Sequence, residues 1–180
     1  MSEIDSLAQA MLEQAKRFLE KAKESGDAEG KAAFLNASLL LCFASFEAHV
    51  NAIVDDFSER QEFSTHERAV LLEKEVKLKD GAFELARAIK MYRLDDRIQF
   101  LCRRFSGSPL DTRAPWWGQF QTASKLRNGL THPKENVVLN ESMVSEALSA
   151  AVAGLGVIYQ AVYKGKFPAE GRGLDSKLNF

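Results

Sequence analysis

The chain has 180 residues, enough for one sizeable hydrophobic core and too few for two comfortable domains. Hydrophobic residues make up 46% and charged residues 27%, which is ordinary for a soluble globular domain. The formal net charge of -1 excludes a global basic field that would draw the protein to nucleic acid. Any contact with RNA must therefore come from a local patch of charge.

The cysteines and the N-terminal residues narrow the class of protein further. Cys42 and Cys102 lie in apolar helical runs and form no spacing motif, so neither a disulfide scaffold nor a zinc site is supported. Residues 1–5 lack the basic start and apolar block of a signal peptide. No apolar run approaches the ~20 residues that a membrane span requires. We expect a cytoplasmic protein with no membrane segment.

Apolar residues at spacings of three or four predict helices through most of the chain. The first helix covers about residues 4–22 and is broken by residues 25–30. A longer second helix follows over about residues 31–57. Its main apolar stripe is Leu35, Leu39, Cys42, Phe46, Val50, Ile53 and Phe57. Residues 64–67, Ser-Thr-His-Glu, have the capping-box pattern that opens a shorter third helix.

The middle of the chain is ambiguous. Residues 75–81 alternate polar and apolar side chains, which hints at an extended segment, but one isolated strand has no partner here. We therefore predict a loop or turn over 75–81, with the helical pattern resuming from about Ala82. The stripe of the next helix is Leu94, Ile98, Leu101 and Phe105, and it ends at residues 106–107.

Two further helices complete the prediction. Trp116 or Trp117 starts the first of them, which Pro133 stops. Asn140 is the predicted N-cap of the last helix. Residues 165–180 are polar and contain glycines, so we expect a loosely held tail there.

These elements predict an all-α helical bundle of about five or six helices. We expect a single domain over residues 1–164, followed by a C-terminal tail over residues 165–180. Gly154 and Gly156 in the last helix would allow close approach of a second helix in a dimer.

Two polar residues interrupt an apolar face of the second helix. Glu47 and Asn51 are four residues apart, in a ladder that otherwise contains Leu40, Ala44 and Val54. An ionised carboxylate that is buried without a partner is costly, so we expect a partner for Glu47 and nominate Arg127. The alternative is that the helix is turned slightly and Glu47 reaches water.

The most informative stretch is residues 125–135, which places Arg127 and Asn128 ahead of His132 and Pro133. Asn128 and His132 lie on a polar helix face that also carries Gln121 and Ser124. The residue before a proline favours extended geometry, so His132 can leave the helical path and approach Arg127. The alternative is structural, because a histidine at a helix C-terminus interacts favourably with the helix dipole.

Arg127, Asn128 and His132 resemble the Arg-x(4–6)-His motif of the HEPN superfamily, in which a polar residue often follows the arginine. Residues 45–51, with Glu47 and Asn51, resemble the polar helix that packs against that motif. As architecture the resemblance covers about residues 4–163. It implies a HEPN-like fold and a metal-independent endoribonuclease with a composite site in a homodimer, without a cofactor. Such proteins are typically toxins or antiviral enzymes, often neutralised by an antitoxin-type partner protein.

The chemistry of these residues fits the activity that the resemblance implies. Cleaving RNA without a metal requires a proton to leave the 2′-hydroxyl and another to reach the leaving 5′-oxygen. Histidine suits that exchange near neutral pH, and the planar fork of arginine can bind two phosphate oxygens. His132 and Arg127 are therefore the candidate catalytic residues, with Asn128 assisting and Glu47 and Asn51 supporting them.

A basic stripe offers a second possible contact with RNA. The residues at helical spacing are Lys90, Arg93, Arg97 and Arg104, with Phe100 on the same face. The alternative is an ordinary solvated face of an amphipathic helix.

A rival function remains open, in which the same residues form a catalytically silent helical module. Such a module would bind RNA, a nucleotide or a protein partner. His49, His66 and His132 show no metal-ligand spacing, and the chain has no glycine-rich phosphate loop after a strand. Geometry separates the two readings, because the nuclease needs Arg127 and His132 to face a shared open cleft at a two-fold interface.

Overall fold

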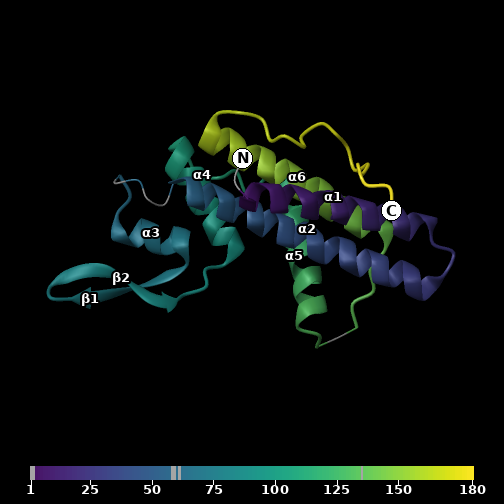
Figure 1. Ribbon diagram of the computed structural model, residues 1–180, viewed down its shortest axis with the longest axis horizontal. Helices are drawn as coiled ribbons and strands as arrows, with labels where there is room; N and C mark the ends of the chain where they lie inside the picture. Colours follow the sequence, from purple (N-terminus) through teal and green to yellow (C-terminus); the bar gives the residue numbers. More distant parts are fainter. Residues whose placement is uncertain (1–2, 58–59, 61, 135) are drawn as a thin grey trace.

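A computed structural model of the chain describes residues 3–57, 60, 62–134 and 136–180. Over these residues it has six helices and one two-stranded sheet, which confirms the predicted helical bundle (Figure 1). In chain order the elements are α1 (Glu3–Glu24), α2 (Ala28–Phe57), α3 (Thr65–Leu72), β1 (Lys74–Lys79), β2 (Ala82–Ile89), α4 (Leu94–Ser106), α5 (Pro115–Thr131) and α6 (Glu141–Tyr163).

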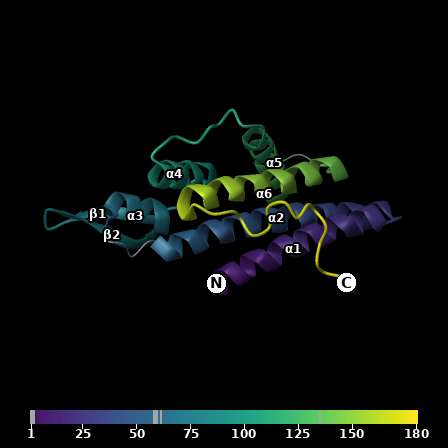
Figure 2. The ribbon, with the colours of Figure 1, turned by 90° about the horizontal axis from the view of Figure 1, so that it is seen from above.

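The core forms around α2, which lies between α1 and the layer that contains α4, α5 and α6 (Figure 2). Small residues of α1, among them Ala8 and Ala15, are fully buried and allow α1 and α2 to approach closely. Ser38 and Ser45 of α2 use this proximity, because their hydroxyls donate to the carbonyl oxygens of Ala15 and Ala8 at 2.7 and 2.8 Å. Burial of apolar surface in this layer is the main stabilising term of the fold.

The apolar character of α2 and α6 departs from the sequence expectation. By length and composition both helices are apolar enough to cross a membrane, although no such run was expected. Core helices of soluble proteins pass the same test. In the most apolar window, 61% of α2 and 50% of α6 is buried inside the bundle, so this indication is weak.

Two predicted helix starts are confirmed by their N-cap residues. The Ser64 hydroxyl accepts from the backbone N–H of Glu67, and the Glu67 carboxylate accepts from the backbone N–H of Ser64, which completes the capping box. Asn140 accepts from the backbone N–H of Met143 at 3.0 Å and begins α6. These short-range bonds satisfy backbone donors that a helix start leaves unpaired.

The prediction for residues 75–89 was wrong, because both segments are strands. β1 and β2 pair antiparallel, with Leu78 opposite Phe83 and Lys79 opposite Ala82. Asp80 and Gly81 link them with φ angles of 50° and 82°. An Asp-Gly pair at positive φ forms the tight turn that matches the twist of a hairpin. Residues 82–89, which we predicted to be helical, are therefore the strand that pairs with the first one.

The hairpin extends from one end of the bundle and packs against α3 (Figures 1 and 2). The ring of Phe83 meets that of His66 edge-on at 5.1 Å between centroids.

The C-terminal segment 165–180 has no helix or strand, but it is not loosely held as expected. Phe167 and Ala169 are each only 1% exposed. Farther along, the Ser176 hydroxyl donates to the Glu13 carbonyl oxygen at 2.8 Å, and its backbone N–H donates to Glu20 at 2.7 Å. This segment therefore crosses the bundle and covers part of α1.

α5 crosses the bundle with its N-terminal half packed inside and its C-terminal end projecting outward (Figure 1). Trp117 and Phe120 of the first half are buried. Gly154 of α6 makes room for Trp116, since a Cβ at that position would lie 2.8 Å from the indole. This glycine therefore serves packing within the chain rather than the dimer contact predicted for it.

Candidate functional site

His132 lies at the C-terminal end of α5, as the sequence predicts. It is the C-cap, and its backbone N–H donates to the carbonyl oxygen of Asn128 at 2.9 Å. Its φ of −131° is outside the helical range, as expected for a residue before Pro133. The side chain of His132 is exposed to solvent. Its position therefore permits contact with a ligand.

Arg127 and Glu47 form the predicted ion pair between α5 and α2. The Arg127 Nη2 donates to Glu47 Oε1 at 2.9 Å. The same guanidinium lies over the Phe43 ring, 5.1 Å from its centroid. Glu47 was expected to be buried, but its side chain is 43% exposed. The carboxylate therefore orients the arginine and also reaches water. The predicted pairing with Arg127 and the alternative of contact with solvent both describe part of its environment.

Asn51, predicted as a supporting residue, contacts Arg97 of α4. Its Oδ1 accepts from Arg97 Nη2 at 2.9 Å, while Arg97 Nη1 donates to Glu73 at 3.2 Å. The other Arg97 contact is to the carbonyl oxygen of Leu71. Burial lowers the pKa of Arg97, and the nearby Glu73 and Glu47 carboxylates partly offset that effect. This cluster joins α2, α4 and the C-terminal end of α3 into one wall.

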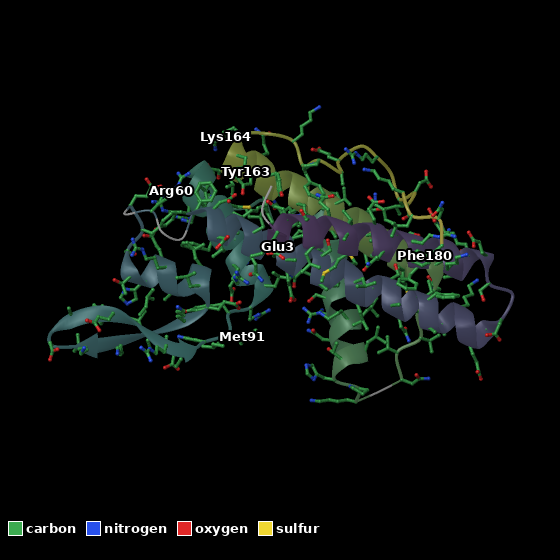
Figure 3. The ribbon with its side chains drawn as sticks, viewed as in Figure 1. Glu3, Arg60, Met91, Tyr163, Lys164 and Phe180 are labelled. Carbon is green, nitrogen blue, oxygen red and sulfur yellow. The ribbon has the colours of Figure 1, made fainter. Side chains whose placement is uncertain are left out.

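A cleft of about 410 Å³ lies between this wall and α5. Its lining comes from α2, α5, the start of α4 and the linker that joins β2 to α4, where Figure 3 marks Met91. The residues that line it are Glu47, Asn51, Glu73, Met91, Tyr92, Arg93, Leu94, Asp95, Arg97, Phe120, Gln121, Ser124, Lys125, Arg127 and Asn128. We call this the α2–α5 cleft. Its volume is typical of a small-molecule site.

A second, more open hollow lies at the end of α5, and we call it the α5 groove. It is lined by Lys125, Asn128, Gly129, His132, Lys134 and Val137. Its lining includes two lysines and, among the described residues, no carboxylate. The α5 groove is thus a local basic surface on a chain with a net charge of -1.

Within a single chain, Arg127 and His132 do not line the same hollow. Arg127 lines the α2–α5 cleft, whereas His132 lines the α5 groove. Lys125 and Asn128 line both and connect the two. Asn128 is therefore the predicted site residue that bridges the arginine and the histidine.

The close fit around the α5 groove depends on Gly129. A Cβ there would lie 2.6 Å from Val137 Cγ2, so a larger residue would require the Val137 side chain to shift. This contact holds the groove's far wall in place. Helical periodicity could not predict this contact, because Gly129 lies in α5 and Val137 lies after the end of that helix.

The basic stripe predicted for RNA does not exist as one surface. Lys90 and Arg93 precede α4, which begins at Leu94, so they cannot continue its helical spacing. Arg97 is 5% exposed and bonded inward. Arg104 is half-buried and pairs with Glu67 at 3.0 Å. The prediction failed because helical periodicity places residues on a face but does not reveal which acids that face meets.

Several residues of the site were missed or given another role. Lys125 and Lys134 lie in the informative stretch but were not among the predicted site residues, and neither was Tyr92. The signal available for the lysines was their position beside Asn128 and His132. Tyr92 had no local signal, because its linker reaches the cleft only through the hairpin.

No group of three or more His, Cys, Asp or Glu in the described part of the chain is arranged to hold a metal ion. Cys42 and Cys102 are free and buried, and burial raises the pKa of each thiol, to about 12 and about 11 respectively. His49 is also buried, whereas His132 is exposed to solvent. None of these three residues contributes to either hollow.

Comparisons of the chain with family models, with curated proteins and with solved structures find no match.

Proposed function

We propose that the chain is an endoribonuclease of the HEPN type that acts as a homodimer without a metal ion. The observation that supports it is the Arg127 guanidinium held by Glu47, with Asn128 leading from it to the exposed His132 and a groove whose described lining residues include two lysines and no carboxylate. This arrangement offers a fixed cation for a phosphate and an imidazole for proton transfer.

The reaction requires two proton movements on RNA. A neutral imidazole takes the proton of a ribose 2′-hydroxyl while that oxygen attacks the adjacent phosphorus. The bond to the 5′-oxygen breaks, and an imidazolium donates a proton to that leaving oxygen. The products are a 2′,3′-cyclic phosphate and a free 5′-hydroxyl. Arg127 stabilises the charge that builds on the non-bridging oxygens.

A homodimer would supply the second histidine and arginine that the proposed reaction needs. One chain offers one exposed His132, which lines a different hollow from Arg127. A second copy placed about a two-fold axis at the projecting end of α5 would bring another Arg127 and His132 to the same phosphate, since a two-fold contact uses the same patch on both copies. One imidazole would then act as base and the other as acid.

The biological setting in this proposal is a cytoplasmic toxin or antiviral enzyme. An antitoxin-type partner protein would restrain it by covering the α5 groove. A cytoplasmic location is compatible with the burial of α2 and α6 in the core. RNA is the proposed substrate, and no membrane is involved.

The test is cleavage of labelled single-stranded RNA and transfer RNA in EDTA by the purified protein. We expect the wild type to cut and to leave 2′,3′-cyclic phosphate ends. His132→Ala and Arg127→Ala should each lower the rate by at least ~10²-fold, since they remove the proton-transfer group and the phosphate cation.

Matched controls separate the site from general effects of lost charge. His66→Ala removes an exposed histidine of α3, and Arg113→Ala removes an arginine whose side chain is 92% exposed. Both controls should cut at the wild-type rate. A folded, dimeric wild type that cuts no substrate, or a His132→Ala protein with full activity, would refute the nuclease.

One observation favours the rival function of a silent binding module. Within one chain His132 faces solvent rather than a hollow shared with Arg127. Under this second proposal the protein would bind the same RNA without cutting it, and Lys125→Ala would weaken that binding. The cleavage assay and a gel-shift assay on the same RNA distinguish the two.

A further inference from the structure

The α2–α5 cleft and the α5 groove differ in how their charges are compensated. Each arginine in the lining of the cleft has a carboxylate partner. The pairs are Arg127–Glu47, Arg97–Glu73 and Arg93–Asp95, with closest N–O distances of 2.9, 3.2 and 2.8 Å. Glu47 engages Arg127 through Nη2, so this arginine can still contact the one scissile phosphate of the proposed reaction, but a second anion in the cleft gains little from cations that are already paired. The interior of the cleft therefore favours an uncharged polar group over a second phosphate.

The α5 groove has the opposite character. Lys125, His132 and Lys134 line it, and none of the described residues in its lining is acidic. A phosphate is therefore most strongly attracted there. Because Lys125 and Asn128 line both hollows, one ligand can place its phosphate in the groove and its uncharged part in the cleft.

The walls of the cleft suit a flat aromatic group with polar edges. Met91 and Tyr92 of the linker and Leu94 at the start of α4 line the cleft, as do Gln121 and Ser124 of α5. Nucleobases bind in this way, by stacking on aromatic rings and by hydrogen bonds to their edges.

Tyr92, the aromatic residue of the linker in this lining, is positioned by a backbone hydrogen bond and by a cation above its ring. The backbone N–H of Tyr92 donates to Glu73 Oε1 at 3.2 Å, and Glu73 is itself bound to the buried Arg97. On the ring itself, Lys90 Nζ lies 5.3 Å from the centroid. A preorganised wall loses less entropy when a ligand binds, which favours specific recognition.

We propose that the α2–α5 cleft is a nucleobase subsite and that it prefers guanine. The proposal deepens the proposed RNA-cutting function, on which it rests, by naming the base beside the scissile phosphate. Guanine presents two neighbouring N–H donors on one edge, and Glu47 offers acceptors there. Only Glu47 Oε1 is engaged by Arg127, and within the described residues Oε2 has no hydrogen-bond partner.

The test is calorimetric titration of the wild-type protein with GMP, AMP, CMP, UMP and ribose 5-phosphate. Ribose 5-phosphate measures the phosphate contact alone. We expect GMP to bind roughly tenfold more tightly than ribose 5-phosphate, because that factor lies within the range that one stacked base contributes. GMP should also bind several-fold more tightly than the other three nucleotides. Equal affinity for all five ligands, or a preference for another base, would overturn the proposal.

Variants of residues in the cleft lining identify where the base binds. Tyr92→Ala should reduce GMP affinity to that of ribose 5-phosphate, whereas Tyr92→Phe should retain the difference because the ring remains. Gln121→Ala should weaken GMP, and Gln119→Ala is its matched control on the same helix, outside the cleft lining. Lys125→Ala should weaken all five ligands by a similar factor. Unchanged GMP binding in Tyr92→Ala and Gln121→Ala would place the base elsewhere and refute the subsite.

The experiment also separates this proposal from the nuclease itself. Mononucleotides have no internal phosphodiester bond, so their binding does not depend on cleavage. A protein that prefers GMP but cuts no RNA would keep the subsite and lose the nuclease. A protein that cuts RNA but binds all five ligands equally would keep the nuclease and lose the subsite.

Discussion

At the scale of single residues, the Glu47–Arg127 pair positions a cation more than it stabilises the fold. Its two side chains are 43% and 24% exposed, and ion pairs reached by water contribute about 0–1 kcal/mol. The hydrogen bond and the Phe43 ring together limit the orientations of the guanidinium. In the proposed nuclease, its role would be to hold the guanidinium fork ready for a phosphate.

His49 is a buried histidine whose protonation we expect to affect stability. It is fully buried, and within the described residues neither ring nitrogen has a hydrogen-bond partner. The rings of Tyr159 and Phe167 meet it edge-on at 6.2 and 5.0 Å. Burial lowers the pKa of His49 from 6.5 to about 4, although the Asp5 carboxylate acts in the opposite direction. The folded protein therefore disfavours the charged imidazole.

We predict that stability falls as the pH drops from 6.5 towards 4. In that window the unfolded chain binds a proton at His49 that the folded chain does not, so stability is complete above pH 6.5. The loss from this residue reaches about 3 kcal/mol near pH 4. Urea unfolding at several pH values measures it.

The comparison that isolates this effect is with His49→Leu, which keeps an apolar side chain of similar volume. Its free energy of unfolding should depend less on pH than that of the wild type over the same window. His66→Leu, at an exposed position, should follow the wild type. Parallel pH profiles for the wild type and His49→Leu would contradict the assignment.

At the scale of elements, the crossing of α5 and α6 depends on the absence of one side chain. A Cβ on Gly154 would lie 2.8 Å from Trp116 Cζ3 and 3.2 Å from Phe46 Cε2. Both neighbours are rigid rings packed with Phe120, so neither can move cheaply. This contact also fixes the N-terminal part of α5, the helix that carries the candidate site residues at its other end.

We predict opposite effects of the two glycine substitutions in α6. Gly154→Ala should destabilise the protein by about 1–2 kcal/mol, because overpacking outweighs the gain in helix propensity. Gly156→Ala meets nothing closer than 3.5 Å and should stabilise it by about 0.5–1 kcal/mol. Urea unfolding at neutral pH compares them. Equal shifts in both variants would show that the Trp116 contact does not control the packing.

At the scale of the whole molecule, the proposed chemistry requires two copies. We predict a dimer in sedimentation measurements, with the activity per chain rising in step with the fraction of dimer as concentration increases. Because His132 and Arg127 line different hollows in one chain, a monomer should be inactive. An active monomer, with a rate per chain independent of concentration, would rule out the composite site.

The sequence by itself located the helices, because helix formation depends on neighbouring residues, although it placed the start of α4 near Ala82 rather than Leu94. Periodicity located α1, α2, α4, α5 and α6, and the capping residues Ser64 and Asn140 marked two helix starts. It also determined that Glu47 needed a partner and that Arg127 was available. Local propensity, however, misread residues 82–89, where a two-residue turn outweighed the apparent helical pattern.

Only the tertiary structure decided which charges are free and which hollows exist. Arg97 and Lys125 look alike in the sequence, yet Arg97 is buried among Asn51, Glu73 and Leu71, whereas Lys125 lines the open groove. Tyr92 reaches the cleft only because the hairpin returns the chain there. Burial and ion pairing depend on contacts between residues far apart in the chain. For that reason the sequence could nominate Arg127, Asn128 and His132, while the fold decided what surrounds them.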